Sequence, residues 1–272
     1  MSFAPVVPFG GYAGWSFLTR TMEAQKQAFT QQASVQRDTD YFREKIGSVK
    51  TAEDLVADRR LLKVALGAFG LQGDINSRFF IQKVLSDGTL DNTDLANRLA
   101  NKSYYELASA FAFDLATPST QISTFADEII TAYRNRKFEE AVGTVSDEMR
   151  LALNARRELE KLAGKQSSDN TKWFTILGSA PLRSLFQTAF GLPKSFAAID
   201  LDQQLGTMQS RADRYLGSRE VAQFADPARV GDLIKLFLLR SQVQQVASIS
   251  SGAAALTLLQ NAQPKNLLSR LA

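Results

Sequence analysis

Apolar residues recur at helical spacing along most of the chain, beginning near the N-terminus. The first stripe has gaps of three, four and seven residues, which places its members on one face of a helix. Two glutamines, Gln25 and Gln32, occupy further positions of that face. A helix docked on the chain's own core and a terminal helix that binds a partner both fit this pattern. The candidate partner-binding residues are Trp15, Leu18, Met22 and Phe29.

Signals for helix starts and ends accompany the later stripes. The cluster Asp38-Thr39-Asp40 is a candidate N-cap, and Thr51 is another before the apolar positions that run to Phe69. Asp226-Pro227 predicts a further helix start, because proline suits the first helical position. No convincing alternation of apolar and polar residues predicts a strand. The sequence therefore predicts an all-α, multi-helical fold.

An internal repeat is predicted from the tetrapeptide Ala-Phe-Gly-Leu, which occurs at residues 68–71 and 189–192. In each copy a phenylalanine ends an apolar helical face, and a glycine follows where a helix can end with a left-handed residue. Apolar positions before and after the tetrapeptide match at similar steps, which favours duplication of a helical unit. Two unrelated helices that both end in glycine remain the alternative. The residues that mark the repeat are Phe69, Gly70, Phe190 and Gly191.

Breaks between the stripes indicate five regions. Residues 1–13 contain prolines and glycines, which predicts an extended or mobile start. We expect a first helical unit at 14–116, a long connecting helical region at 117–165 and a second unit at 166–247. A tail rich in small residues follows at 248–272. The two units are expected to pack either as one domain or as two.

Composition narrows the chemistry that the chain can perform. The 272 residues include neither histidine nor cysteine, which excludes disulfides, thiol nucleophiles, His-containing triads and Cys/His zinc sites. The net charge of +4, from 32 basic and 28 acidic residues, is small and spread out. We therefore expect no nucleic-acid partner. No run approaches the ~20 apolar residues of a membrane span, and the N-terminus lacks the layout of a secretory signal.

Motifs for cofactors and metals are weak. Ala163-Gly164-Lys165-Gln166-Ser167 lacks the first glycine of a phosphate loop and has glutamine where a hydroxyl must reach magnesium. The acidic loop from Asp87 has Asn92 where a calcium loop needs glycine and Arg98 where it needs glutamate. The carboxylate pairs Asp127-Glu128 and Glu139-Glu140 are expected to solvate helix surfaces. We predict no catalytic residue, no cofactor and no metal site.

Two basic patches, 134–137 and 156–157, are interleaved with glutamates. A groove that binds phosphate is one interpretation of this pattern. An exposed helix surface with intrahelical salt bridges is the interpretation that the interleaving favours.

Several segments resemble an uncharacterised α-proteobacterial family, a domain of unknown function. They are residues 8–21, with Gly10-Gly11-Tyr12-Ala13-Gly14-Trp15, and residues 41–46, 51–71, 79–81 and 95–99. The resemblance implies an all-helical protein, because members of that family look helical, and a flagellum-associated role, because their genes commonly sit in flagellar clusters. It implies no catalytic residues, since none are known for the family.

These observations lead to the expectation of a non-enzymatic structural or assembly protein of the flagellar system with protein partners. The alternative is a cytoplasmic chaperone or regulator of flagellar export clients. The expected location is accordingly cytoplasmic or flagellum-associated.

Overall fold

The computed structural model describes residues 3–261, with side chains up to residue 245, and this part of the chain is all-α and contains no strand. The fold class predicted from the sequence is therefore confirmed. The α-helices are α1 (Gly11–Thr30), α2 (Ala33–Lys45), α3 (Ala52–Ala57), α4 (Arg59–Phe69), α5 (Arg78–Asp87), α6 (Leu95–Arg98), α7 (Ser103–Phe111), α8 (Phe125–Val145), α9 (Asp147–Ala163), α10 (Asp169–Gly178), α11 (Ala180–Phe190), α12 (Leu201–Leu216) and α13 (Pro227–Asn261). Single turns of 3₁₀ helix lie at Ile46–Ser48, Gln72–Asp74 and Ser119–Gln121, and longer ones at Lys194–Ala198 and Val221–Ala225.

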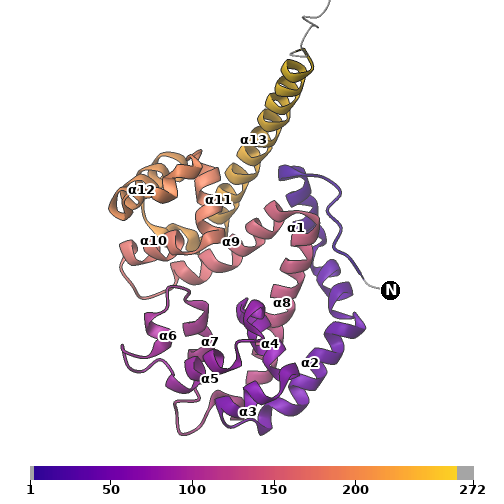
Figure 1. Ribbon diagram of the computed structural model, residues 1–272, viewed down its shortest axis with the longest axis vertical. Helices are drawn as coiled ribbons and strands as arrows, with labels where there is room; N and C mark the ends of the chain where they lie inside the picture. The colour runs from indigo at the N-terminus through magenta and orange to yellow at the C-terminus, as the bar shows by residue number, and fades with distance from the viewer. Residues whose placement is uncertain (1–2, 262–272) are drawn as a thin grey trace, which may run out of the picture.

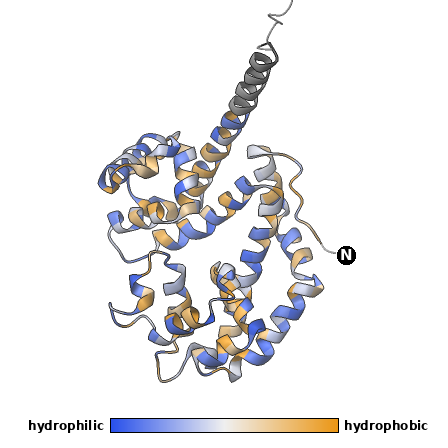
Figure 2. Cartoon of the chain, viewed as in Figure 1, coloured by the Kyte–Doolittle hydropathy of each residue, from blue (hydrophilic) through white to orange (hydrophobic). Residues whose placement is uncertain are grey.

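The helices pack around two main cores that meet along α8. Helices α2 to α7 surround one core with the first half of α8, which contributes Ile130 and Tyr133. Helices α9 to α13 surround the other core with α1 and the second half of α8, which contributes Phe138 and Val142. Figure 1 shows the first group in the lower half of the view and the second in the upper half, with α13 extending away from both. Polar and apolar residues alternate on the helices of both halves, as expected of amphipathic helices (Figure 2).

This packing groups the helices differently from the regions drawn on the sequence. Helix α1, placed in the 14–116 unit by sequence, packs with α8 and α13 in the other core. The 117–165 region consists of α8 and α9, which supply buried residues to the cores and change direction at Ser146. Since Val145 and Met149 keep a helical spacing, the hydrophobic pattern gave no sign of this break.

Local capping explains where several helices begin. The Thr51 side chain accepts from the Asp54 amide and Asp54 caps back, which forms the capping box expected of a helix start. Asp226 Oδ1 accepts from the Ala228 amide at 2.9 Å, and Pro227 opens α13 as predicted. Asp58 ends α3 and starts α4 by accepting from the amides of Arg60 and Leu61. The single helix expected here is therefore two.

The N-cap predicted at Asp38-Thr39-Asp40 is wrong, because α2 already begins at Ala33 and these residues lie in its middle. Tertiary contacts account for them instead. Asp38 Oδ2 accepts from Tyr133 Oη at 3.0 Å and pairs with Lys63 Nζ at 2.6 Å, so it joins α2 to α8 and α4. The desolvation of Tyr133 and the nearby Asp38 carboxylate both raise the pKa of this tyrosine.

The two glutamines of the α1 stripe hold the N-terminal segment. Gln25 is buried, and its side-chain amide accepts from the Val6 N–H at 2.8 Å and donates to the Val6 carbonyl at 3.1 Å. Gln32 donates to the Phe3 carbonyl at 3.2 Å. The segment before α1 is thus extended and runs back along the helix, and residues 11–13 of the expected N-terminal segment already belong to α1. These hydrogen bonds to the backbone of the N-terminal segment explain why two positions of the apolar stripe are glutamines.

The two Ala-Phe-Gly-Leu segments end α4 and α11 with the same local geometry. Gly70 and Gly191 have φ of 76° and 64°, in the left-handed region. The Leu71 amide donates to Leu66 O and the Leu192 amide to Gln187 O, both at 2.8 Å, as in a Schellman motif. These shared ends are consistent with the predicted duplication and with the alternative of two independent glycine-ended helices. The duplication itself stays a prediction.

An arginine guanidinium from the next long helix covers each glycine. A Cβ at Gly70 would lie 3.2 Å from Arg136 Nη1 of α8, and one at Gly191 would lie 2.4 Å from Arg240 Nη1 of α13. Gly217 ends α12 with φ of 80° and has nothing within 4 Å. A cation at a helix C-terminus is favourable because it meets the negative end of the helix dipole.

We expect glycine-to-alanine substitutions at these helix ends to destabilise the protein in the order Gly191, Gly70, Gly217. Gly217→Ala should cost about 1–2 kcal/mol, the strain of a left-handed alanine. Gly191→Ala should add roughly 0.5–1 kcal/mol, because Arg240 must leave the end of α11. Urea unfolding of the three variants measures the order. Equal losses in all three would show that the arginines contribute nothing at these ends.

Candidate functional site

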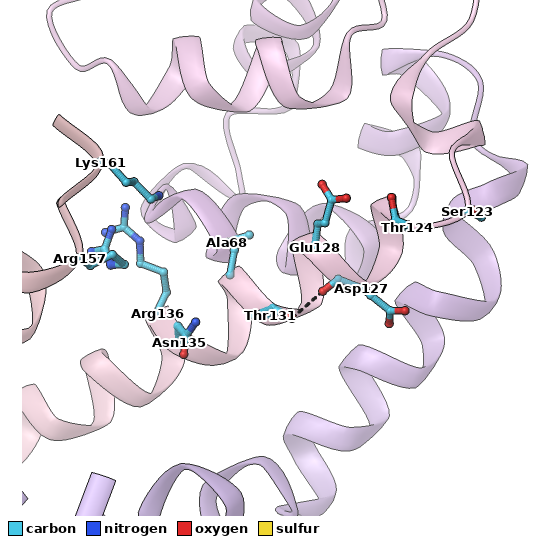
Figure 3. Close-up of a pocket in the computed structure, with 11 residues that line it drawn as sticks. Ala68, Ser123, Thr124, Asp127, Glu128, Thr131, Asn135, Arg136, Arg157 and Lys161 are labelled. Atoms are coloured by element: carbon cyan, nitrogen blue, oxygen red, sulfur yellow. Dashed lines mark hydrogen bonds between the residues drawn. The ribbon is translucent and has the colours of Figure 1, made fainter. Parts of the chain in front are cut away.

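One pocket of about 610 Å³ is lined by the first half of α8, by α9 and by Ala68 at the end of α4. Figure 3 shows cationic side chains gathered at one end and acidic and hydroxyl side chains at the other. The lining residues are Ala68, Ser123, Thr124, Asp127, Glu128, Thr131, Ala132, Asn135, Arg136, Arg157 and Lys161.

Two arginines at the cationic end are paired with glutamates from the facing helix. Arg136 Nη2 of α8 lies 3.1 Å from Glu158 Oε1 of α9, and Arg157 Nη2 of α9 lies 3.1 Å from Glu139 Oε2 of α8. Arg157 also pairs with Glu158. All four side chains are mostly buried, with exposed fractions between 11% and 21%. The prediction of an exposed helix with intrahelical salt bridges is therefore wrong for these two arginines, whose pairs with Glu158 and Glu139 join α8 to α9 and are mostly buried. It fits Lys137, which pairs with Glu140 within α8.

Burial lowers the pKa of both guanidinium groups, and the nearby Glu139 carboxylate opposes that shift. Loss of solvent also lowers the pKa of Lys161, with Arg157 and Arg136 adding to the shift and Glu106 opposing it. Lys161 is exposed at the rim of the pocket, so solvent screens much of this effect. The pairing leaves Lys161 as the cation of the pocket most open to an anionic ligand.

The other end of the pocket is tied to the fold. Asp127 Oδ1 accepts from Arg43 of α2 at 2.6 Å, and Thr131 Oγ1 donates to the Asp127 carbonyl at 2.7 Å. The ion pair between Arg43 and Asp127 therefore ties α2 to α8 at this end of the pocket.

A second candidate is a set of exposed apolar side chains on the elements that meet where α13 leaves the body of the molecule. We call it the α13 root and define it by five exposed side chains. Phe9 and Val243 are the most open, at 61% and 68%. The other three are 40–49% exposed. The α13 root consists of Phe9, Tyr12, Val145, Leu239 and Val243.

Contacts from three elements converge at the α13 root. Lys235 Nζ of α13 lies 5.5 Å from the centre of the Tyr12 ring at the start of α1. Gln242 packs so closely on Gly11 that a Cβ there would collide with its amide. Glu148, at the start of α9, accepts from Ser241 Oγ at 2.7 Å and from Gln245. The starts of α1 and α9 therefore brace α13, and beyond them the helix continues away from the body (Figure 1).

The structure places the four candidate partner-binding residues of α1 in the protein's own core. Leu18 is fully buried, and Trp15, Met22 and Phe29 are no more than 7% exposed. Phe29 makes an edge-to-face contact with Phe138 of α8 at 5.8 Å. These residues face α8, α9 and their neighbours because the stripe has a core to cover within the same chain. They are therefore not part of the α13 root.

The repeat-marking residues also have structural roles. Phe190 is buried in the aromatic cluster with Phe186, at 5.4 Å between ring centres, while Phe69 is partly buried beside the other core. Sequence reasoning missed the α13 root itself. One signal was present, since the sequence contains no charged residue from Ser241 to Pro264, directly after the buried face of α13.

Within the described residues, no group of three acidic side chains is arranged to hold a metal ion. No helix in the same part of the chain is long and apolar enough to cross a bilayer.

Comparison with known proteins places the chain in a family. No curated protein matches it. The crystal structure of Protein AGR_C_984 from Agrobacterium tumefaciens is similar, with a TM-score of 0.73 and 27% sequence identity over 89% of this chain and 99% of that chain. The sequence model of a family described as "Protein of unknown function (DUF1217)" matches residues 68–230. This range includes α8, α9 and every residue that lines the pocket. The chain therefore belongs to the DUF1217 family.

Proposed function

We propose that this protein is a non-enzymatic assembly or interaction protein associated with the flagellum, and that it makes its contacts at the α13 root. The observation that carries the proposal is the exposed apolar surface where α13 leaves the body between the starts of α1 and α9. Exposed apolar side chains gathered at one place are typical of protein–protein contact surfaces.

The flagellar part of the proposal rests on resemblance. The family that the sequence resembles has genes that commonly sit in flagellar clusters, and a similar structure comes from Agrobacterium tumefaciens. Gene neighbourhood is an association and gives no mechanism. A helical body with a projecting helix suits an assembly role, because such a helix offers a long face to a partner helix.

Deletion of the gene in a flagellated host tests the proposal. We expect the deletion to reduce swimming and filament assembly, and the wild-type gene to restore both. Val243→Glu should fail to restore them, since it places a charge in the apolar surface. Gln244→Glu is the matched control, because it adds the same charge at the neighbouring exposed position of α13.

Normal motility and normal filaments in the deletion strain would contradict the proposal. Purified hook–basal bodies provide the second measurement, and we expect the protein in that fraction. Its presence in the cytosol alone would favour the chaperone or regulator of export clients instead.

A further inference from the structure

We propose that three arginines gathered around Tyr215 form a binding site for a phosphate group, either free phosphate or a phosphate monoester. We call this site the Tyr215 cluster and define it as Arg211, Arg214, Tyr215 and Arg240. The proposal goes beyond the function proposed above, because it assigns a ligand to a different surface. It rests neither on the flagellar role nor on the α13 root.

Two helices bring the arginines of the cluster together. Arg211, Arg214 and Tyr215 lie at positions i, i+3 and i+4 of α12, so they share one face of that helix. Arg211 Nη1 donates to Tyr215 Oη at 3.3 Å, and the guanidinium carbon of Arg214 lies 5.6 Å from the centre of the tyrosine ring. The guanidinium carbon of Arg240, from α13, lies 4.6 Å from the same ring centre. Three guanidinium groups therefore converge on one side chain.

The packing around the cluster holds it in place. The Tyr215 ring stacks on the buried ring of Phe190, with 5.9 Å between the centres and 23° between the planes. Arg240 also covers Gly191 at the end of α11, which restricts its guanidinium group. Side chains that are already ordered lose less conformational freedom when a ligand binds. The arginines are therefore arranged for a ligand before it arrives.

No acidic side chain in the described part of the chain neutralises these three arginines. Every aspartate and glutamate of the sequence has a described side chain, and none of them forms an ion pair with Arg211, Arg214 or Arg240. Asp213, which is next to Arg214 in sequence, pairs with Arg219 at 3.4 Å instead. The tyrosine hydroxyl is neutral and balances no charge. The cluster thus carries three positive charges that the protein leaves for an anion to balance.

The positive field acts on Tyr215 itself. Hydrogen bonding from Arg240 lowers the pKa of Tyr215, with burial opposing the shift and Arg211 and Arg214 adding to it. Nearby cations lower a pKa because they favour the negatively charged form of the group. The same field favours an anion that comes from solvent and approaches the hydroxyl.

A phosphate group suits the cluster better than a carboxylate does. A guanidinium group donates two parallel hydrogen bonds to phosphate oxygens, and a phosphate dianion has enough oxygens to engage more than one arginine. A carboxylate offers two oxygens and a single charge, so it balances less of the cluster. Arg214 is exposed, and Arg211 and Arg240 are partly exposed, so the ligand can reach them from solvent.

Isothermal titration calorimetry of the purified full chain with inorganic phosphate, at constant ionic strength, tests the proposal. We expect one site per chain with a dissociation constant on the order of 1 mM, because salt screens partly exposed charges. Acetate should bind about tenfold more weakly, since it carries one charge and two oxygens. Phosphoserine distinguishes the two sources of the group. Tighter binding of phosphoserine identifies a phosphorylated chain as the ligand, and tighter binding of inorganic phosphate identifies the free ion.

Substitutions in the cluster test which residues bind. The double variant Arg211→Gln, Arg214→Gln should weaken phosphate binding by about tenfold or more, because it removes two of the three guanidinium groups. Arg214→Lys alone should weaken it by roughly threefold, since lysine keeps the charge and loses the planar fork. Arg20→Gln is the matched control, because Arg20 is exposed on α1 and its loss changes the net charge equally at a distant place. It should leave the dissociation constant unchanged.

Thermal melting provides a second measurement that also shows whether the variants fold. Phosphate should raise the melting temperature of the wild-type chain, because a ligand that binds the folded state stabilises it, and should not raise that of the double variant. Failure of the wild-type chain to bind phosphate would overturn the proposal, as would equal affinity for acetate and phosphate. Binding that the double variant retains, or that Arg20→Gln weakens equally, would also overturn it.

Discussion

Replacement of Leu18 by alanine is expected to lower the free energy of unfolding by roughly 3–5 kcal/mol. Leu18 is fully buried between α1 and the core that α8, α9 and α13 share. The substitution removes apolar contact and leaves a cavity that rigid helices on several sides cannot close. Urea unfolding followed by circular dichroism measures the loss.

Gln27→Ala is the control for this substitution, because Gln27 is exposed on the same helix. We expect it to change stability by less than about 0.5 kcal/mol. An unchanged melt for Leu18→Ala would contradict the core position of α1. It would restore the interpretation of Trp15 and Leu18 as partner-binding residues.

Glu139→Ala should lower the free energy of unfolding by about 2–3 kcal/mol, because it removes a carboxylate that pairs with the mostly buried Arg157. Loss of one partner from a fully buried pair costs more, but both side chains here retain some solvent and Arg157 keeps Glu158. The pair lies on α8 and α9, between Tyr133 of one core and Phe138 of the other. Its loss should therefore weaken the junction of the two cores.

Glu140→Ala is the matched control one residue away. Glu140 pairs with Lys137 on the surface of α8, with its side chain 49% exposed, so the expected loss is under about 0.5 kcal/mol. A second variant separates charge from packing. Combining Glu139→Ala with Arg157→Met should recover part of the stability, because no unpaired guanidinium is then left between the helices. Equal effects of Glu139→Ala and Glu140→Ala would show that the buried pair has no special role.

The charged pocket and the α13 root have different consequences for function. In the pocket, both arginines are already paired with glutamates across α8 and α9. Their burial is therefore explained by the packing of these two helices. At the α13 root, phenylalanine, tyrosine and valine side chains keep 40–68% of their surface exposed. The second surface therefore carries the proposed function.

The sequence by itself determined the local features of this protein. Helical spacing of apolar residues identified the all-α class, because a period near 3.6 leaves an apolar face on each helix. Gly70, Gly191, Thr51 and the Asp226-Pro227 pair marked helix ends correctly. Each of these signals depends on neighbours within one turn, so it can be read along the chain.

Only the tertiary structure decided which surface each apolar stripe covers. The spacing of Trp15 and Leu18 predicts an apolar helix face but does not say what that face packs against. In the fold it packs against α8, α9 and α13 of the same chain. Asp38 was expected to cap a helix and instead joins α2 to Tyr133, because a carboxylate in mid-helix is held by groups distant in sequence. Exposure of the α13 root likewise depends on where the body ends. A periodic pattern fixes the face of a helix, and the packing of other segments decides what that face meets.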